Sequence, residues 1–249
     1  MMTSAAPVAS LAMYPFAAAR AATDELWSAV RARLDWGPES LEWTVLTPDV
    51  WHHPQLLVAQ ACGWPLVTEL ADSVAVVGTF DYDVPGAEHG RYRSVLVARD
   101  AATLDELRAQ PKVVAAVNSL DSLSGWISLQ HAWGDKPPVL ETGAHVESAR
   151  AVAEGRADLA SIDAVTWALL ETIEPELTGR LHVIGHGPLV PCLPLVTGWR
   201  NTQRVPALRA AFAAAVAAPE LQPALAQLHI RGFVEMRLAD YLPLRTLLD

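Results

Sequence analysis

The chain has 249 residues, of which 51% are hydrophobic and 18% are charged, and its formal net charge at pH 7 is -10. This length can build one large domain or two moderate lobes, and this composition excludes a disordered chain. Lys112 and Lys136 are the only lysines, and a surface so poor in clustered cations excludes nucleic acid and anionic membranes as partners.

The first residues predict a strand followed by a helix. No basic residue precedes Arg20, and Pro15 interrupts a weak apolar stretch, so the pattern of an export signal is missing. Residues 9–14 are therefore expected to form a core strand and residues 17–34 a helix, with the cytoplasm as the expected compartment. Insertion into a membrane is not expected, because no run reaches the ~18 apolar residues that span a bilayer.

Further along the chain, apolar runs of strand type alternate with runs of helical period, which is typical of an α/β protein with largely parallel sheets. The expected strands are residues 9–14, 41–46, 74–80, 92–98, 113–118, 159–163, 181–185 and 193–197. The expected helices are residues 17–34, 54–61, 122–133, 145–154, 164–171 and 206–217. In sheets of this kind ligands gather where the carboxyl ends of strands lead into helices.

One such junction is unusually rich in hydroxyl groups. The apolar run that begins at Val113 gives way after residue 117 to "NSLDSLSG", and helical spacing starts at Ser122. Ser119, Ser122 and Ser124 could hold an anion at the helix start, where backbone N–H groups lack partners and the helix dipole is positive. Ordinary capping by Asp121 or Ser122 is the alternative, and the sequence leaves both open.

A second junction repeats this design. "TGAHVESARAVAEGRADLASIDAVTW", residues 142–167, presents His145 at the start of a helix that Gly155 ends. The strand that follows places Asp163 at its carboxyl end, just before the next helix. A lone His or Asp is usually structural, but two such loops on one sheet favour a binding site.

The remaining motifs argue against metals, cofactors and covalent chemistry. Neither "HVIGH" nor the pair His52–His53 has a carboxylate or cysteine at the spacing of metal ligands. Nucleotide-binding glycine loops are absent, and "SLSG" lacks the first glycine of a nucleophile elbow. No metal and no cofactor are expected. Cys62 and Cys192 could pair, but are better interpreted as small buried side chains.

The two junctions also carry a resemblance to a known family. "GAHVESARAVAEGRADLASIDAVTW" is similar to a segment of phosphate-, phosphite- and phosphonate-type ABC transporter substrate-binding proteins, and "VNSLDSLSG" resembles their serine-rich helix start. "LLVAQACGWPLV", residues 56–67, resembles the "Q.CG.PL" stretch of one subgroup. The resemblance covers about residues 9–198, and it implies a type II periplasmic-binding-protein fold, two α/β lobes with the ligand cleft between them.

The resemblance also implies a domain division and a hinge. Residues 1–95 and 197–249 would form lobe one, and residues 96–196 would form lobe two. The strands at 92–98 and 191–197 would cross between them, and ligand binding would close the lobes by a hinge motion.

The resemblance implies a set of ligand-binding residues as well. In lobe two, an oxyanion would be held by the turn and by His145, and Asp163 would accept a hydrogen bond from a protonated oxygen or an amine of the ligand. Tyr14 would face them from lobe one, beside the less specific candidates of the "Q.CG.PL" stretch. The complete set is Tyr14, Gln60, Gly63, Trp64, Ser119, Ser122, Ser124, Gly125, Trp126, His145 and Asp163.

Two classes of function follow. The first is a binding protein for a small anionic ligand such as a phosphonate, either as a transport component with an ABC permease or as a cytoplasmic relative; the family itself implies a periplasmic location. The second is a biosynthetic enzyme on the same two-lobed fold, since a fold does not fix function. His145 and Asp163 could serve as acid and base, but no Cys or Lys nucleophile lies in the predicted loops, so binding without catalysis is expected.

Overall fold

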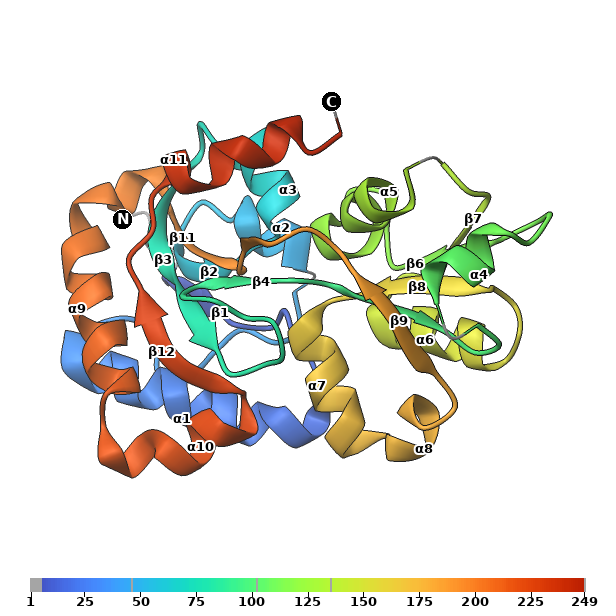
Figure 1. Cartoon of the computed structure of the whole chain (residues 1–249). Helices are drawn as coiled ribbons and strands as arrows, with labels where there is room; N and C mark the ends of the chain where they lie inside the picture. Colours follow the sequence, from blue (N-terminus) through green and yellow to red (C-terminus); the bar gives the residue numbers. More distant parts are fainter. Residues whose placement is uncertain (1–5, 46, 102, 135, 249) are drawn as a thin grey trace. The chain divides into compact units, whose positions relative to one another are not determined.

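The computed structural model describes residues 6–45, 47–101, 103–134 and 136–248. Its strands and helices confirm the α/β class, and they divide into two compact units, each built around a five-stranded sheet (Figure 1). Unit 1 comprises Met1–Asp83, Glu88–Gly90 and Pro191–Leu244, and unit 2 comprises Val84–Ala87, Arg91–Val190 and Arg245–Asp249.

The sheet of unit 1 draws its strands from both ends of the chain. In the order β1-β2-β11-β3-β12 it contains β1 (Val8–Ser10), β2 (Leu56–Gln60), β11 (Pro194–Gly198), β3 (Val74–Tyr82) and β12 (Ile230–Val234). Only the β1–β2 pair is parallel among these described pairs; β11 runs antiparallel to β2 and β3, and β12 runs antiparallel to β3.

Helix α1 (Ala17–Leu34) contacts α9 (Val205–Val216) and α10 (Gln222–Gln227), and both α9 and α10 contact strand β12 of this sheet (Figure 1). In α1 the buried side chains recur every three or four positions, which is the period of one helix face; they are Ala19, Ala22, Thr23, Leu26, Trp27, Val30 and Leu34. The helix ends at Asp35, whose left-handed backbone (φ 60°) directs its N–H to the carbonyl of Arg31.

Shorter segments complete unit 1. They are α2 (Thr47–Trp51), α3 (Gly63–Pro65), the π-helix η1 (Leu66–Leu70), the 3-10 helices η3 (Trp199–Arg204) and η4 (Pro219–Leu221), and α11 (Leu238–Tyr241). The 3-10 helix η5 (Leu242–Thr246) contains the passage from unit 1 to the last residues of unit 2.

Unit 2 has a mixed sheet of its own. In the order β7-β6-β8-β5-β9 it contains β7 (Val139–Glu141), β6 (Ala115–Val117), β8 (Leu159–Ile162), β5 (Val95–Ala98) and β9 (His182–His186). Strands β7, β6 and β8 are mutually parallel, whereas β5 runs antiparallel to β8 and β9. The connecting helices are α4 (Leu104–Arg108), the π-helix η2 (Leu123–Ile127), α5 (Ser128–Trp133), α6 (His145–Ala153), α7 (Ala164–Ile173) and α8 (Pro175–Thr178).

The chain passes between the units next to a small separate sheet, in which β4 (Arg91–Tyr92) pairs with β10 (Val190–Pro191). The boundaries expected from the sequence, at residues 95–96 and 196–197, fall inside β5 and β11. Each of those strands belongs wholly to one unit. The single strand expected over residues 92–98 is divided into β4 and β5.

Three expectations about the strands and sheets are wrong. Residues 54–61 contain the strand β2 and not a helix: all five residues of β2 are buried, and a short apolar run does not distinguish a central strand from a buried helix. Residues 41–45 form no strand, because the Glu42 side chain accepts the backbone N–H groups of Thr44 (2.6 Å) and Val45 (3.2 Å) in a local turn; Leu46 lies outside the described residues. The sheets are mixed instead of largely parallel.

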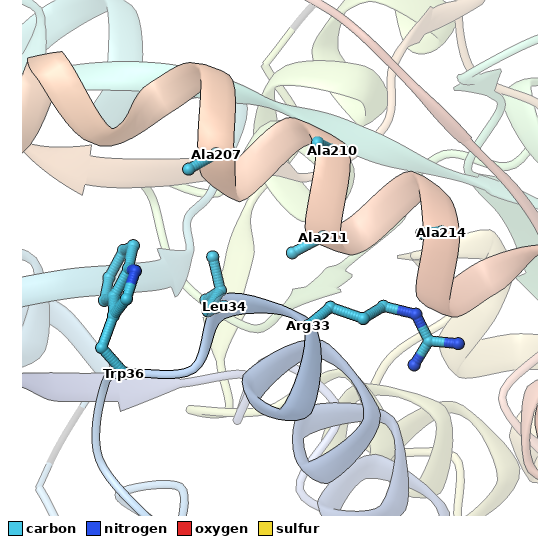
Figure 2. Close-up of a pocket in the computed structure, with 7 residues that line it drawn as sticks. All are labelled: Arg33, Leu34, Trp36, Ala207, Ala210, Ala211 and Ala214. Atoms are coloured by element: carbon cyan, nitrogen blue, oxygen red, sulfur yellow. The ribbon is translucent and has the colours of Figure 1, made fainter.

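Unit 1 carries a hollow on its surface between the end of α1 and α9 (Figure 2). It measures about 350 Å³ and arises because α9 presents only methyl side chains there. Its lining residues are Arg33, Leu34, Trp36, Ala207, Ala210, Ala211 and Ala214. The guanidinium of Arg204 lies 4.6 Å from the centre of the Trp36 ring. None of the residues that the sequence predicts for the ligand lines this hollow.

Cys62 and Cys192 are both buried as thiols and are not joined in a disulfide. Within the described part of the chain, no helix has the length and apolar character needed to cross a bilayer.

Candidate functional site

The carboxyl ends of β6, β7 and β8 lie at one edge of the unit 2 sheet, because these neighbouring strands are parallel. Each strand leads into a turn and then a helix: β6 into η2, β7 into α6 and β8 into α7. Two backbone bonds extend the pairing beyond β6, from the N–H of Thr142 to the carbonyl of Val117 (2.9 Å) and from the N–H of Gly143 to that of Asn118 (3.0 Å). The start of α6 is thereby held beside the turn after β6.

That turn opens into a wide helix start. Ser122 is its N-cap, and the Ser122 hydroxyl oxygen accepts the N–H of Gly125 at 3.0 Å. The Ser122 carbonyl accepts two further N–H groups, those of Trp126 and Ile127, each at 3.0 Å. The second bond spans five residues, so the first turn is a π-type turn, a form that is frequent at functional sites.

Ser124 and His145 meet across the two junctions. The hydroxyl of Ser124 lies 2.8 Å from Nε2 of His145, the first residue of α6. The Ser124 carbonyl is itself held, because the buried hydroxyl of Ser161 on β8 donates to it at 2.5 Å. Three chain segments therefore fix this serine in place.

The surroundings of the His145 ring favour its neutral form. Burial lowers its pKa, although the negative charge of Asp163 and the carbonyl of Ser161 act in the opposite direction. Nδ1 is covered completely and makes no hydrogen bond of good geometry.

Asp163 serves first as the N-cap of α7. One of its carboxylate oxygens, Oδ1, accepts the N–H groups of Val165 (2.9 Å) and Thr166 (3.0 Å). The residue is 2% exposed. The Asp163 side chain thus caps α7 and also supplies the negative charge that acts on His145.

Gly125 and Asn118 form the floor of the turn. A Cβ atom at position 125 would overlap Oδ1 of Asn118 and would lie 3.1 Å from the Ser122 hydroxyl. Oδ1 of Asn118 is covered and makes no hydrogen bond. Gly125 was expected from the sequence, whereas Asn118 was not included in the site although it belongs to the same polar turn.

The other residues expected in this unit, Ser119 and Trp126, contact groups other than His145. The Ser119 hydroxyl bonds to the carboxylate of Asp121, and the neighbouring Leu120 is 51% exposed. Trp126 is half-buried and packs against the hydrophobic core of unit 2. The structure therefore brings Ser122, Ser124, Gly125 and His145 together, with Asp163 close enough to influence the ring.

The expected residues of unit 1 form a separate group. The buried Gln60 donates from its side-chain amide to the hydroxyl of Tyr82 at 3.0 Å. The ring of Tyr14 stands edge-on to that of Tyr82, with centroids 6.0 Å apart. Gly63 and Trp64 open α3, which begins shortly after the carboxyl end of β2.

Tyr82 and Ser161 were not expected at the site, and only Ser161 could have been predicted from the sequence pattern. It stands two positions before Asp163 in a strand, and alternate side chains of a strand share a face. Tyr82 comes close to Gln60 only through the sheet. Among the described residues no group of three His, Cys, Asp or Glu side chains has the arrangement of a metal site.

A family model matches most of the chain. Residues 56–241 match the family described as "ABC transporter, phosphonate, periplasmic substrate-binding protein". No curated protein matches the chain.

Solved structures share the fold at low sequence identity. PhnD1 of Prochlorococcus marinus in complex with methylphosphonate has a TM-score of 0.75 and 14% identity, with 97% of this chain and 96% of that chain covered. The binding protein component of an ABC phosphonate transporter from Pseudomonas aeruginosa has a TM-score of 0.71 and 20% identity, with 90% and 80% covered. A Xanthomonas citri protein bound to chloride ion has a TM-score of 0.70 and 14% identity, with 97% and 95% covered. The two-lobed type II periplasmic-binding-protein fold is thereby confirmed.

Proposed function

This chain belongs to the family of periplasmic substrate-binding proteins of phosphonate ABC transporters, and on that premise we propose that it binds a phosphonate-like oxyanion at the turn between β6 and η2. The observation that carries this proposal is the Ser124–His145 contact of 2.8 Å at a helix start. A half-buried imidazole beside a hydroxyl and the first turn of a helix can receive negative charge without any long cationic side chain.

The chemistry of the proposed site is anion capture by short donors. The Ser124 hydroxyl and the backbone N–H groups of the first turn donate to the ligand oxygens, assisted by the positive end of the helix dipole. When an oxyanion replaces Ser124 as the partner of Nε2, it stabilises the imidazolium form of His145. Each charge-assisted hydrogen bond is worth about 1.5–3 kcal/mol, which is about ten- to hundredfold in affinity.

Asp163 gives the proposed site its selectivity. A carboxylate close to a bound oxyanion repels a fully ionised ligand that carries no donor. It attracts a ligand that presents an ammonium group or a protonated oxygen next to the anionic group. Aminomethylphosphonate is therefore expected to bind more tightly than methylphosphonate, from which it differs by a single ammonium group.

Residues of unit 1 complete the proposal. The Gln60 amide donates to the hydroxyl of Tyr82, and the Tyr14 ring stands edge-on to the Tyr82 ring; we propose that this group contacts the remainder of the ligand. Ser119, Gly63, Trp64 and Trp126 remain candidates on the resemblance alone. An ABC permease is the expected partner of a protein of this family.

Calorimetry with both phosphonates tests the site. Ser124→Ala is expected to weaken binding by about tenfold or more, because one charge-assisted donor is lost. Ser128→Ala is the matched control: Ser128 lies one turn further along, is fully buried, and its hydroxyl makes no hydrogen bond. Equal affinity of Ser124→Ala and the wild type, with both variants folded, would contradict the proposed site.

Binding without catalysis is part of the proposal, supported by the family, whose members bind and deliver substrates. The second candidate function, a biosynthetic enzyme, would require turnover of the bound ligand. Mass analysis of a phosphonate after prolonged incubation with the protein distinguishes the two, and conversion of the ligand would favour the enzyme. The family is periplasmic; the cytoplasmic location expected from the sequence stays a prediction, which cell fractionation tests.

A further inference from the structure

Gly90 is the point at which unit 1 joins two of the chain segments that lead to unit 2. It is the last residue of unit 1 before Arg91, and the return passage lies between Val190 and Pro191. The carbonyl of Gly90 accepts the N–H of Cys192 at 2.9 Å, which ties the outgoing segment to the returning one. The carbonyl of Cys192 in turn accepts the hydroxyl of the fully buried Tyr241 at 3.0 Å.

A single carboxylate holds Gly90 from the other side. Oδ1 of Asp81, on β3, accepts the N–H of Gly90 at 2.8 Å. The same carboxylate pairs with Arg231 of β12, whose Nε lies 3.0 Å from Oδ2 and whose second guanidinium nitrogen lies 3.3 Å from Oδ1. The Asp81 side chain is only 15% exposed, so solvent screens this pair less than an ordinary surface pair.

The local backbone is built for this contact. The register of β12 against β3 shifts between Ile230 and Gly232, so Arg231 is the extra residue of a β-bulge, a feature that re-aims a side chain. Gly90 has a φ of 75°, and a Cβ there would lie 3.0–3.2 Å from Met236, Thr79 and Val234. Only glycine combines this conformation with so close a seat on the sheet.

The pKa shifts of Asp81 and Arg231 both favour the ion pair. Burial would raise the pKa of Asp81, but the bonds from Arg231 and from the Gly90 N–H, and the charges of Arg231 and His89, lower it. The pKa of Arg231 is raised, chiefly by its bond to Asp81. Asp83 also faces Arg231, at 3.8 Å, but its side chain is 78% exposed.

We propose that Asp81 and Arg231 form a clamp that fixes Gly90, and through Gly90 also Cys192, and so sets the stiffness of the connection through which ligand binding closes the lobes. The clamp acts on binding as a positioning device: Asp81 and Arg231 order the connecting segments before the ligand arrives. In a protein without the clamp this ordering must occur during binding and opposes it.

Hydrogen exchange resolved at single amides tests the clamp without any ligand. In Asp81→Ala the amides of Gly90 and Cys192 are expected to exchange together, about tenfold faster or more, because the shared anchor opens. Asp81→Asn keeps an acceptor for Gly90 but loses the charge, so its effect is expected to lie between Asp81→Ala and the wild type. Asp83→Asn removes a nearby exposed charge and is expected to exchange like the wild type.

Amides of β2 and β11 serve as the internal reference, because they report opening of the whole unit. If Asp81→Ala leaves the Cys192 amide as slow as in the wild type, or speeds the reference amides equally, the clamp is overturned.

The role in binding rests on the proposed function and has its own measurement. Stopped-flow dissociation of methylphosphonate is expected to be about fivefold faster in Asp81→Ala, the factor for about one kcal/mol of added ordering cost. Faster exchange with unchanged dissociation would overturn the role in binding. If the wild type fails to bind methylphosphonate, the proposed function fails, and the exchange comparison of the unliganded variants still decides whether the clamp exists.

Discussion

Asp163 offers a test that separates its capping role from its charge. Asp163→Asn retains an oxygen that can accept the N–H groups of Val165 and Thr166, whereas Asp163→Ala leaves both without an acceptor in a position that is 2% exposed. Loss of an N-cap costs about 0.5–2 kcal/mol, and asparagine and aspartate cap about equally well. Asp163→Ala is therefore expected to lower the melting temperature by about 1–8 °C for a chain of this size, and Asp163→Asn by about 1 °C or less.

The charge is visible in a different measurement. In Asp163→Asn the pKa of His145 is expected to fall below its wild-type value, because the carboxylate that favours the imidazolium has been removed. NMR titration of the His145 ring protons reports this directly. Aminomethylphosphonate is expected to lose affinity in the same variant, while methylphosphonate keeps or gains affinity. If Asp163→Asn melts as low as Asp163→Ala, or leaves the His145 titration unchanged, the division of roles is refuted.

Three further predictions concern pH, packing and the N-terminus. Burial lowers the folded pKa of His145. Its contribution to stability is therefore complete above the unfolded pKa of about 6.5 and is lost as the pH falls from there toward the folded pKa. Urea unfolding between pH 8 and 5 checks this: the free energy of unfolding is expected to change less with pH in His145→Gln than in the wild type. Gly78→Ala is expected to destabilise the protein by about 1–3 kcal/mol, because its Cβ would overlap the Phe233 ring. Gly185→Ala is the control in thermal melts, since its Cβ would meet Leu96 at an ordinary 3.4 Å. Equal losses of stability in the two variants would contradict the argument. N-terminal sequencing of the protein from its native host is expected to find residues 8–10 retained, since β1 pairs with β2 in the core, and a mature start beyond Tyr14 would disprove it.

The parts of the site that the sequence predicts are those set by local order along the chain. The places where a strand gives way to a helix contain Ser122, Ser124, His145 and Asp163. Because the neighbouring strands are parallel, these junctions lie at the same edge of the sheet. The contact between Ser124 and Ser161 was not predicted, because it depends on how the π-type turn seats against β8. Periodicity carries no information about that distance.

The elements that the sequence mispredicts are determined by distant partners. Residues 56–60 become a strand because β1 and β11 flank them, and their own apolar run fits a helix equally well. Strand β12 was missed, since "IRGFV" is short and contains a glycine, and the bulge at Arg231 interrupts its alternation. The clamp around Gly90 depends on that bulge, so it too could not be predicted from the sequence.

The central position of β11 has a consequence for the order in which the protein folds as it is synthesised. β2 and β3 leave the ribosome long before β11, which separates them in the finished sheet, so both expose unpaired edges during that interval. All five strands of the unit 2 sheet lie between residues 95 and 186 and can pair before residue 194 is added. The unit that begins first along the chain is thus completed last, and the nascent N-terminal segment, rather than unit 2, is the stretch that depends on protection from aggregation.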